Sequence, residues 1–134
     1  MALGRADKLP VESQDDVVQV RQTVRAWAVE LGLSLVEQTK IVTAASELAR
    51  NTLVHGGGGS VEIESIQEGA RRGLRLTFVD HGPGIADVEQ AMRDGYTTGG
   101  GLGLGLGGSR RLASTFEIRS RPGEGTWVRI VKWA

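Results

Sequence analysis

The sequence of 134 residues contains no cysteine and only two histidines. The absence of cysteine excludes a disulfide scaffold, a thiol nucleophile and cysteine-ligated zinc or iron–sulfur centres, and two histidines argue against a histidine-rich metal site. No apolar run approaches ~18 residues, and residues 1–10 lack the apolar stretch of a signal peptide, so we expect a cytoplasmic protein with no membrane partner. Sixteen basic and sixteen acidic residues cancel, which makes nucleic acid a poor partner.

Glycine, by contrast, is abundant. The chain has 20 glycines, and eleven of them fall in two short runs, 56–59 and 99–108. The runs lack the Gly-X-Y period of collagen. Only three prolines and a hydrophobic content of 40% argue against a disordered chain. The glycines therefore have local structural roles within one folded domain, which we expect to span residues 1–134.

Two amphipathic helices are predicted in the first part of the chain. Ser13 with Asp16, and Ser34 with Glu37, have the spacing of N-terminal capping boxes, and Gly32 supplies a stop between the helices. Apolar residues at spacings of three and four follow each cap, up to about residue 54 in the second helix. The apolar stripe of the first helix consists of Val17, Val20, Val24, Trp27 and Leu31.

The remainder of the chain alternates between strands and short helices. Apolar residues alternating with polar ones predict strands at 61–64, 74–78, 116–120 and 126–133. Shorter helices are expected at 87–92 and from the second glycine run to about residue 114. Short turns between neighbouring strands favour antiparallel pairing. The pattern indicates an α/β two-layer sandwich, with helices on one face of a mixed, largely antiparallel sheet.

Three polar side chains share one face of the second predicted helix. Glu47, Asn51 and His55 recur at a spacing of four, which places them within an arc of about 80° beside the apolar stripe. A carboxylate and an amide would then lie at the rim of the buried face, where a cleft could form. A solvent-exposed polar face is the alternative interpretation, and for His55 we expect a capping or packing role.

Two glycine-containing motifs follow this helix. Asp80 closes a strand before Gly82 and Gly84, where it could accept a hydrogen bond from a ligand amine while the glycines permit close backbone approach; an ordinary Asp-Gly turn is the alternative. The run 99–108 contains G-x-G-x-x-G but does not follow the first strand of a βαβ unit, and the sequence has no P-loop. A lid whose amides meet phosphates fits better than a flexible linker, because three leucines recur at a spacing of two.

The order of these motifs is more specific than any one of them. A helical Glu47-x-x-x-Asn51, a strand ending in Asp80-x-Gly82-x-Gly84 and a glycine-rich lid (about 95–108) that opens a helix resemble the GHKL ATPase family. The resemblance covers nearly the whole chain and implies the Bergerat fold of that family. As a short, stand-alone member of that family, this sequence is similar to the anti-sigma-factor serine/threonine kinases. Within that group it most resembles the RsbT-type switch kinases of stressosome signalling.

The resemblance implies a role for each motif. Glu47 would be the general base that accepts the proton of a protein serine or threonine hydroxyl. Asn51 would contact the nucleotide by ligating the Mg²⁺ that bridges the phosphates of ATP or ADP. Asp80 would accept a hydrogen bond from the adenine amine, with Thr126 supporting that site. The further implied nucleotide-binding positions are Gly82, Gly84 and Ile85 beside the base, and Gly101, Leu102, Gly103, Leu104, Gly105, Leu106 and Gly107 along the phosphates.

The implied function is partner switching in stress signalling. The kinase would phosphorylate STAS-domain proteins and, once released, activate a PP2C-type, metal-dependent phosphatase. The main alternative is an anti-sigma factor that binds a sigma factor and phosphorylates its STAS antagonist; a binding module with vestigial catalysis is a third. Arg50 stands where related kinases often carry a hydroxyl, and Arg110 and Arg111 are both candidates for contacting the γ-phosphate. Gly56–Gly59 are interpreted only as a helix stop and a loop.

Overall fold

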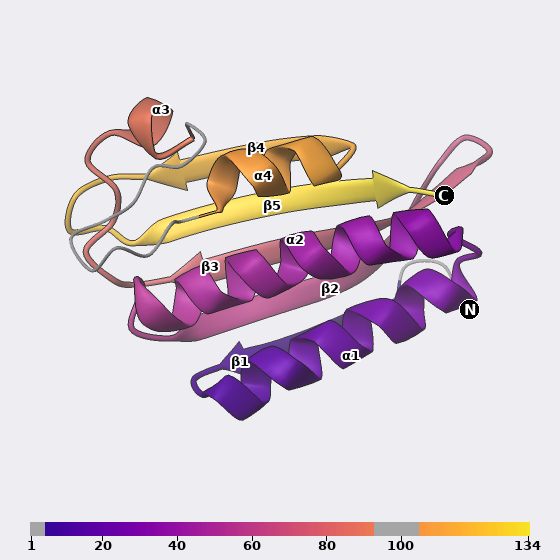
Figure 1. Cartoon of the computed structure of the whole chain (residues 1–134), viewed down its shortest axis with the longest axis horizontal. Coiled ribbons are helices and arrows are strands. Elements are labelled where there is room, and N and C mark those ends of the chain that lie inside the picture. Colours follow the sequence, from indigo (N-terminus) through magenta and orange to yellow (C-terminus); the bar gives the residue numbers. More distant parts are fainter. Residues whose placement is uncertain (1–4, 93–104) are drawn as a thin grey trace.

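The computed structural model describes residues 5–92 and 105–134. Its elements, in chain order, are β1 (Ala6–Val11), α1 (Gln14–Glu30), α2 (Leu35–Val54), β2 (Gly59–Glu68), β3 (Arg71–Asp80), α3 (Val88–Ala91), α4 (Leu106–Leu112), β4 (Thr115–Ser120) and β5 (Thr126–Trp133). The strands form one sheet in the order β1-β2-β3-β5-β4. Figure 1 shows α1, α2 and α4 over one face of this sheet, so the predicted two-layer α/β architecture is confirmed. None of the helices in the described ranges has the length and apolar character needed to cross a bilayer.

The two long helices begin where their capping residues predict. The Ser13 hydroxyl accepts a hydrogen bond from the Asp16 backbone N–H, and the Ser34 hydroxyl accepts one from the Glu37 N–H, both at 3.2 Å. Each bond satisfies a backbone donor that the first turn of a helix leaves without a partner. Helix α1 ends just before Gly32, whose φ of 84° turns the chain toward α2.

The sheet departs from the prediction in one respect. All four strand pairings in the described part of the chain are antiparallel, whereas we expected a mixed, largely antiparallel sheet. The strands β2 and β3 are also longer than predicted, because their pairing continues past the apolar centre into polar residues that flank the turn. Strand β5 pairs with both β3 and β4, so the final hairpin joins the sheet through its second strand.

The N-terminal strand β1 is absent from the sequence-based prediction. It contains Lys8 and Pro10, and Val11 is its one buried residue, so it lacks the alternation that marks a half-buried strand. It lies at the edge of the sheet, where Leu9 pairs with Val61 of β2. Proline and lysine are tolerated on an edge strand because one side of the strand makes no ladder hydrogen bonds. The strand therefore depends on a partner far along the chain.

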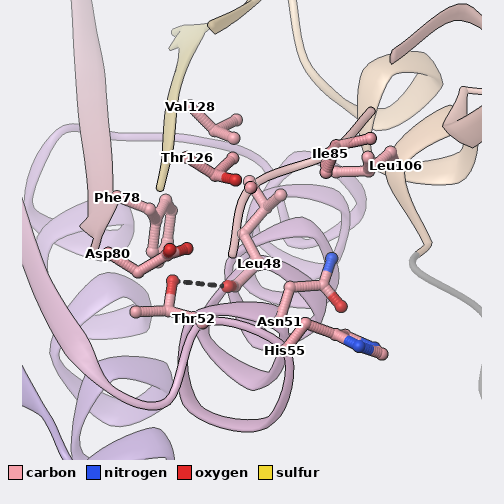
Figure 2. A pocket seen from close by; sticks show the side chains of 12 residues that line it. Leu48, Asn51, Thr52, His55, Phe78, Asp80, Ile85, Leu106, Thr126 and Val128 are labelled. Carbon is pink, nitrogen blue, oxygen red and sulfur yellow. Dashed lines mark hydrogen bonds between the residues drawn. The ribbon is translucent and has the colours of Figure 1, made fainter. Parts of the chain in front are cut away.

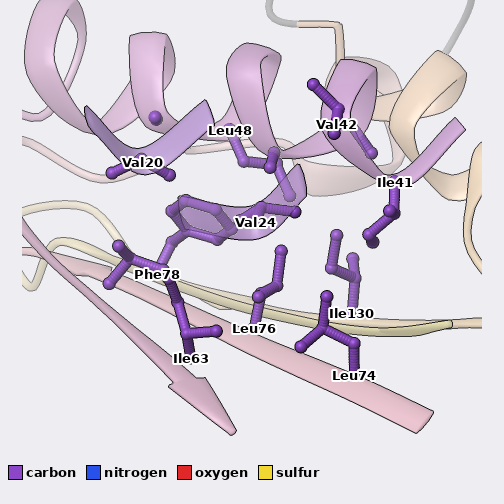
Figure 3. Packing of buried hydrophobic residues seen from close by; sticks show 14 of the residues in the cluster. Val20, Val24, Ile41, Val42, Leu48, Ile63, Leu74, Leu76, Phe78 and Ile130 are labelled. Carbon is purple, nitrogen blue, oxygen red and sulfur yellow. The ribbon is translucent and has the colours of Figure 1, made fainter. Parts of the chain in front are cut away.

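The hydrophobic core fills the space between the helices and the sheet (Figure 3). Residues with no exposed surface come from both layers: Val20, Val24, Ile41, Ile63, Leu74, Leu76 and Ile130. Trp27, in the apolar stripe of α1, is 2% exposed and belongs to this core. Trp127 and Trp133 alternate with the core residues of β5, which puts them on the other face of the sheet. There, Arg119 lies 4.7 Å from the Trp127 ring centroid and Arg71 lies 4.2 Å from that of Trp133.

Candidate functional site

A pocket opens where the C-terminal half of α2, the end of β3, the start of β5 and the start of α4 meet (Figure 2). Its lining residues are Leu48, Asn51, Thr52, His55, Gly56, Phe78, Asp80, Gly84, Ile85, Leu106, Thr126 and Val128. Seven of the twelve are apolar residues or glycines, and the other five carry polar side chains. Such a lining suits a flat, mostly apolar ligand group that is oriented by a small number of hydrogen bonds.

Asp80 is the last residue of β3 and forms part of the pocket wall. It is 9% exposed, and its Oδ1 accepts a hydrogen bond from the Gly82 backbone N–H at 2.9 Å. The register of β3 and β5 sets Asp80 opposite Thr126, so these two polar residues lie next to each other on the same wall. A carboxylate held in this way can accept a hydrogen bond from an amine on a bound ligand.

The Thr126 hydroxyl belongs to a small network that sequence reasoning did not identify. Its Oγ1 lies 2.8 Å from the Ser120 Oγ, which also accepts from the Ile85 N–H at 2.8 Å and donates to the Gly125 carbonyl at 2.9 Å. Because Ser120 has one hydroxyl proton and gives it to Gly125, Thr126 must be the donor between the two hydroxyls. Thr126 Oγ1 can therefore act as an acceptor toward the pocket. The only signal for Ser120 in the sequence was its position opposite Thr126 across the predicted hairpin.

The polar face of α2 is divided between two hollows. Asn51 and His55 line the pocket described above, with their side chains on the same side of the helix in Figure 2, and His55 also borders the second hollow. Glu47, one turn earlier, lines an adjoining hollow between α2 and α4, together with Arg50 and Ser109. The Glu47 side chain is 37% exposed and lies 3.9 Å from an Arg50 nitrogen. The carboxylate and the amide thus share one helix face, as predicted, but reach neighbouring spaces.

The start of α4 lies directly against Glu47. Gly105 precedes the helix with a φ of 66°, a conformation that favours glycine. A Cβ atom at this position would lie 2.7 Å from Glu47 Oε2, so the contact also requires a residue without a side chain. Leu106 is buried and lines the pocket, and Gly107 is buried as well. The end of the predicted lid therefore contacts both hollows.

Other predicted positions are placed less directly. Gly101, Leu102, Gly103 and Leu104 lie outside the described residues. Within the described ranges, no group of three His, Cys, Asp or Glu residues could hold a metal ion. Asn51 offers an amide oxygen at the pocket, which suits a hard cation whose remaining ligands are phosphates and water. Arg110 and Arg111 occupy the exposed last turn of α4 and are not among the residues that line either hollow in the described part of the chain.

Comparison with known proteins identifies the fold to which this site belongs. The family model for the histidine kinase-like ATPase domain matches residues 11–132. The chain is a member of the histidine kinase-like ATPase family. It is 45% identical over 118 residues to the serine/threonine-protein kinase RsbT of Bacillus subtilis (strain 168), covering 88% of this chain and 89% of that protein. It is 32% identical over 119 residues to the anti-sigma F factor of Thermoanaerobacter sp. (strain X514), covering 84% of this chain and 82% of that protein.

Solved structures support the same architecture for this ATPase domain. The RsbU and RsbW domains of Rv1364c from Mycobacterium tuberculosis superpose with a TM-score of 0.65 and 21% identity, over 96% of this chain and 32% of that one. The catalytic domain of the histidine kinase ThkA gives a TM-score of 0.54 and 15% identity, over 96% of this chain and 95% of that one. The resemblance to the GHKL family and the prediction of an enzyme with a kinase-like ATPase domain are both confirmed.

Proposed function

We propose that this ATPase domain is an ATP- and Mg²⁺-dependent protein serine/threonine kinase that acts as a partner-switching regulator. One arrangement carries the proposal: α2 presents Asn51 to the pocket that holds Asp80 and presents Glu47 to the adjoining hollow beside the start of α4. The two hollows would separate the adenine from the reacting γ-phosphate. The 45% identity to a serine/threonine kinase over most of both chains supports the same function.

Each residue then has a defined task. Asp80 accepts a hydrogen bond from the exocyclic amine of adenine. At the same edge of the base, Thr126 accepts a hydrogen bond either from the base itself or from a bridging water molecule. Asn51 would supply one oxygen ligand to a bound Mg²⁺ ion. When bound, this ion neutralises charge on the phosphates. Gly105, Leu106 and Gly107 place the beginning of α4 beside the phosphates.

Glu47 acts as the general base of the transfer. Its carboxylate takes the proton of a serine or threonine hydroxyl on the protein substrate, whose oxygen forms a bond to the γ-phosphorus. The bond from that phosphorus to the bridging oxygen of the β-phosphate breaks, and ADP leaves with the electron pair. The exposure of Glu47 in a hollow on the protein surface fits a substrate that is itself a folded protein.

We propose STAS-domain proteins as the substrates and a PP2C-type phosphatase as the partner activated after release. A second function, sequestration of a sigma factor together with phosphorylation of its STAS antagonist, is supported by the similarity to anti-sigma F factors. Co-purification distinguishes the two, because the kinase would retain a phosphatase in the first case and a sigma factor in the second.

The direct test is phosphate transfer from labelled ATP to a STAS-domain protein encoded near this gene. We expect phosphoserine or phosphothreonine with the wild type, and transfer reduced by about 10²-fold or more in Glu47→Ala with ATP binding retained. Asp80→Asn should lose ATP binding. Its amide oxygen would stay with the Gly82 N–H, so its amide nitrogen, a donor, would face the adenine amine, which is also a donor. Transfer at the normal rate by Glu47→Ala would refute the general-base role, and normal ATP binding by Asp80→Asn would refute the adenine role.

A further inference from the structure

Gly56 has a closer relation to the site than its position after a helix suggests. It follows His55, the residue at the C-terminal end of α2, and it lines the pocket. A Cβ atom built on Gly56 would lie 2.3 Å from the Asp80 Cγ, 2.5 Å from its Cβ and 2.6 Å from its Oδ2. Gly56 does not have a positive φ, so alanine at this position would not be strained by a left-handed backbone. The three atoms nearest to such a Cβ all belong to the Asp80 side chain, so this contact accounts for the need for glycine here.

The surroundings hold Asp80 and Gly56 at this separation. The Gly56 N–H donates to the Asn51 carbonyl at 3.0 Å, which ties the loop to the last turn of α2. On the other side, the Gly82 N–H holds the Asp80 Oδ1, and a Cβ on Gly82 would lie 2.7 Å from the Gly56 Cα. The backbone carbonyl of Asp80 is covered by Gly125, where a Cβ would lie 2.2 Å away. Three glycines from separate loops therefore surround one aspartate.

We propose that Gly56 is a positioning residue that sets the adenine selectivity of this domain by leaving room for the Asp80 carboxylate to face the pocket. The inference rests on the proposed nucleotide function. A methyl group at position 56 overlaps the Asp80 Cβ as well as its carboxyl group, so rotation about χ1 alone cannot relieve the overlap. The end of β3 and the loop after α2 must separate, and the carboxylate moves away from the position at which it meets the amine. The first glycine run would thus contribute to recognition of the base.

The test compares two nucleotides that differ only at the recognised group. Dissociation constants are measured for ATP and for purine riboside triphosphate, in which a hydrogen replaces the exocyclic amine. A hydrogen bond from that amine to a charged acceptor predicts that the wild type prefers ATP by about 10- to 100-fold. In Gly56→Ala we expect this preference to fall to within about threefold. General loosening of the pocket would weaken the binding of both nucleotides equally and leave the ratio of the two dissociation constants unchanged.

Gly57→Ala is the matched control. Gly57 is the next residue of the same loop, and a Cβ there would meet nothing within 4 Å, although its φ of 74° adds local strain. We expect this variant to keep the wild-type preference for ATP. Retention of the full preference by Gly56→Ala would overturn the inference, as would its loss in Gly57→Ala to the same extent. A wild type that binds neither nucleotide would instead refute the proposed function itself.

A second measurement covers the case in which Gly56→Ala does not fold. The Asp80→Gly background removes the Asp80 side-chain atoms that the methyl group would meet. If that contact is what requires glycine, Gly56→Ala should shift the urea midpoint much less in this background than in the wild type. Equal shifts in both backgrounds would show that residue 56 is constrained by something other than the Asp80 side chain and would refute the inference.

Discussion

The turn between β4 and β5 offers a pair of substitutions that differ in a single physical respect. Gly123 and Gly125 both have a φ of 78°. A Cβ on Gly123 would meet nothing within 4 Å, whereas a Cβ on Gly125 would lie 2.2 Å from the Asp80 carbonyl oxygen and 2.9 Å from the His81 Cα. Replacing each glycine with alanine therefore imposes the same conformational strain, and only Gly125→Ala adds overlap with the strand that carries Asp80.

The magnitudes can be set from these contacts. Holding alanine at positive φ costs about 1–2 kcal/mol, which is the whole effect expected for Gly123→Ala. Overlap in a packed region adds about 1–3 kcal/mol for Gly125→Ala. With an unfolding entropy of about 2.1 cal/mol/K per residue, a chain of 134 residues converts that difference into a melting temperature that is about 4–11 °C lower. Both variants should remain folded at 25 °C, since domains are stable by ~5–15 kcal/mol.

Urea unfolding followed by circular dichroism measures the two free energies of unfolding, and nucleotide binding provides a second readout. We expect Gly125→Ala to weaken ATP binding because it displaces the backbone of Asp80, and Gly123→Ala to leave it nearly unchanged. Equal losses of stability in the two variants would refute the claim that this turn packs against Asp80. Normal ATP affinity in a destabilised Gly125→Ala would refute its connection to the site.

Three other outcomes are expected. The two hydrogen bonds from Arg75, at 3.0 and 2.9 Å, lower the pKa of Glu64 below its usual value of 4.5. Because the folded-state pKa of Glu64 is depressed, its pairing with Arg75 stabilises the fold above about pH 4.5, and this benefit is lost as the pH falls through the folded-state pKa. The urea midpoints of the wild type and Glu64→Gln should therefore converge as the pH is lowered, and midpoints that stay equally far apart in acid would contradict this. Leu76→Ala should lower the free energy of unfolding by about 2–5 kcal/mol, as measured in urea, because Leu76 is fully buried, and a loss under ~1 kcal/mol would show that the site collapses around the smaller residue. Ser120→Ala removes the acceptor of the Ile85 N–H and should weaken ATP binding several-fold in a titration while the far-ultraviolet spectrum stays native; unchanged affinity would exclude Ser120 from support of the site.

Local patterns predicted the helices well because the signals for a helix lie within the helix. Ser13 and Ser34 cap α1 and α2 through bonds to residues only three positions away. Strand β1 was beyond such reasoning, since a strand with Lys8 and Pro10 becomes regular only through its pairing with β2. The short turns predicted antiparallel pairing within the β2–β3 and β4–β5 hairpins, whereas the β1–β2 and β3–β5 pairings depend on how distant segments meet.

The candidate site shows the same division. The spacing of Glu47 and Asn51 was sufficient to put them on one face of α2, because helical geometry fixes the angle between residues four apart. That Asp80 and Thr126 stand side by side follows from the β3–β5 register. The roles assigned to these residues came from a family resemblance, and they remain proposals that the substitutions above can test.

The first glycine run, 56–59, shows most clearly the difference between what local sequence patterns predict and what only the tertiary structure reveals. The sequence by itself determined that a helix ends just before the glycine run 56–59, because a run of glycines cannot sustain helical order. Only the tertiary structure decided that Gly56 touches Asp80, a residue placed by a different strand. The reason is physical: helix ends are set by backbone conformation and local hydrogen bonds, whereas room for a carboxylate depends on which segments the sheet brings together.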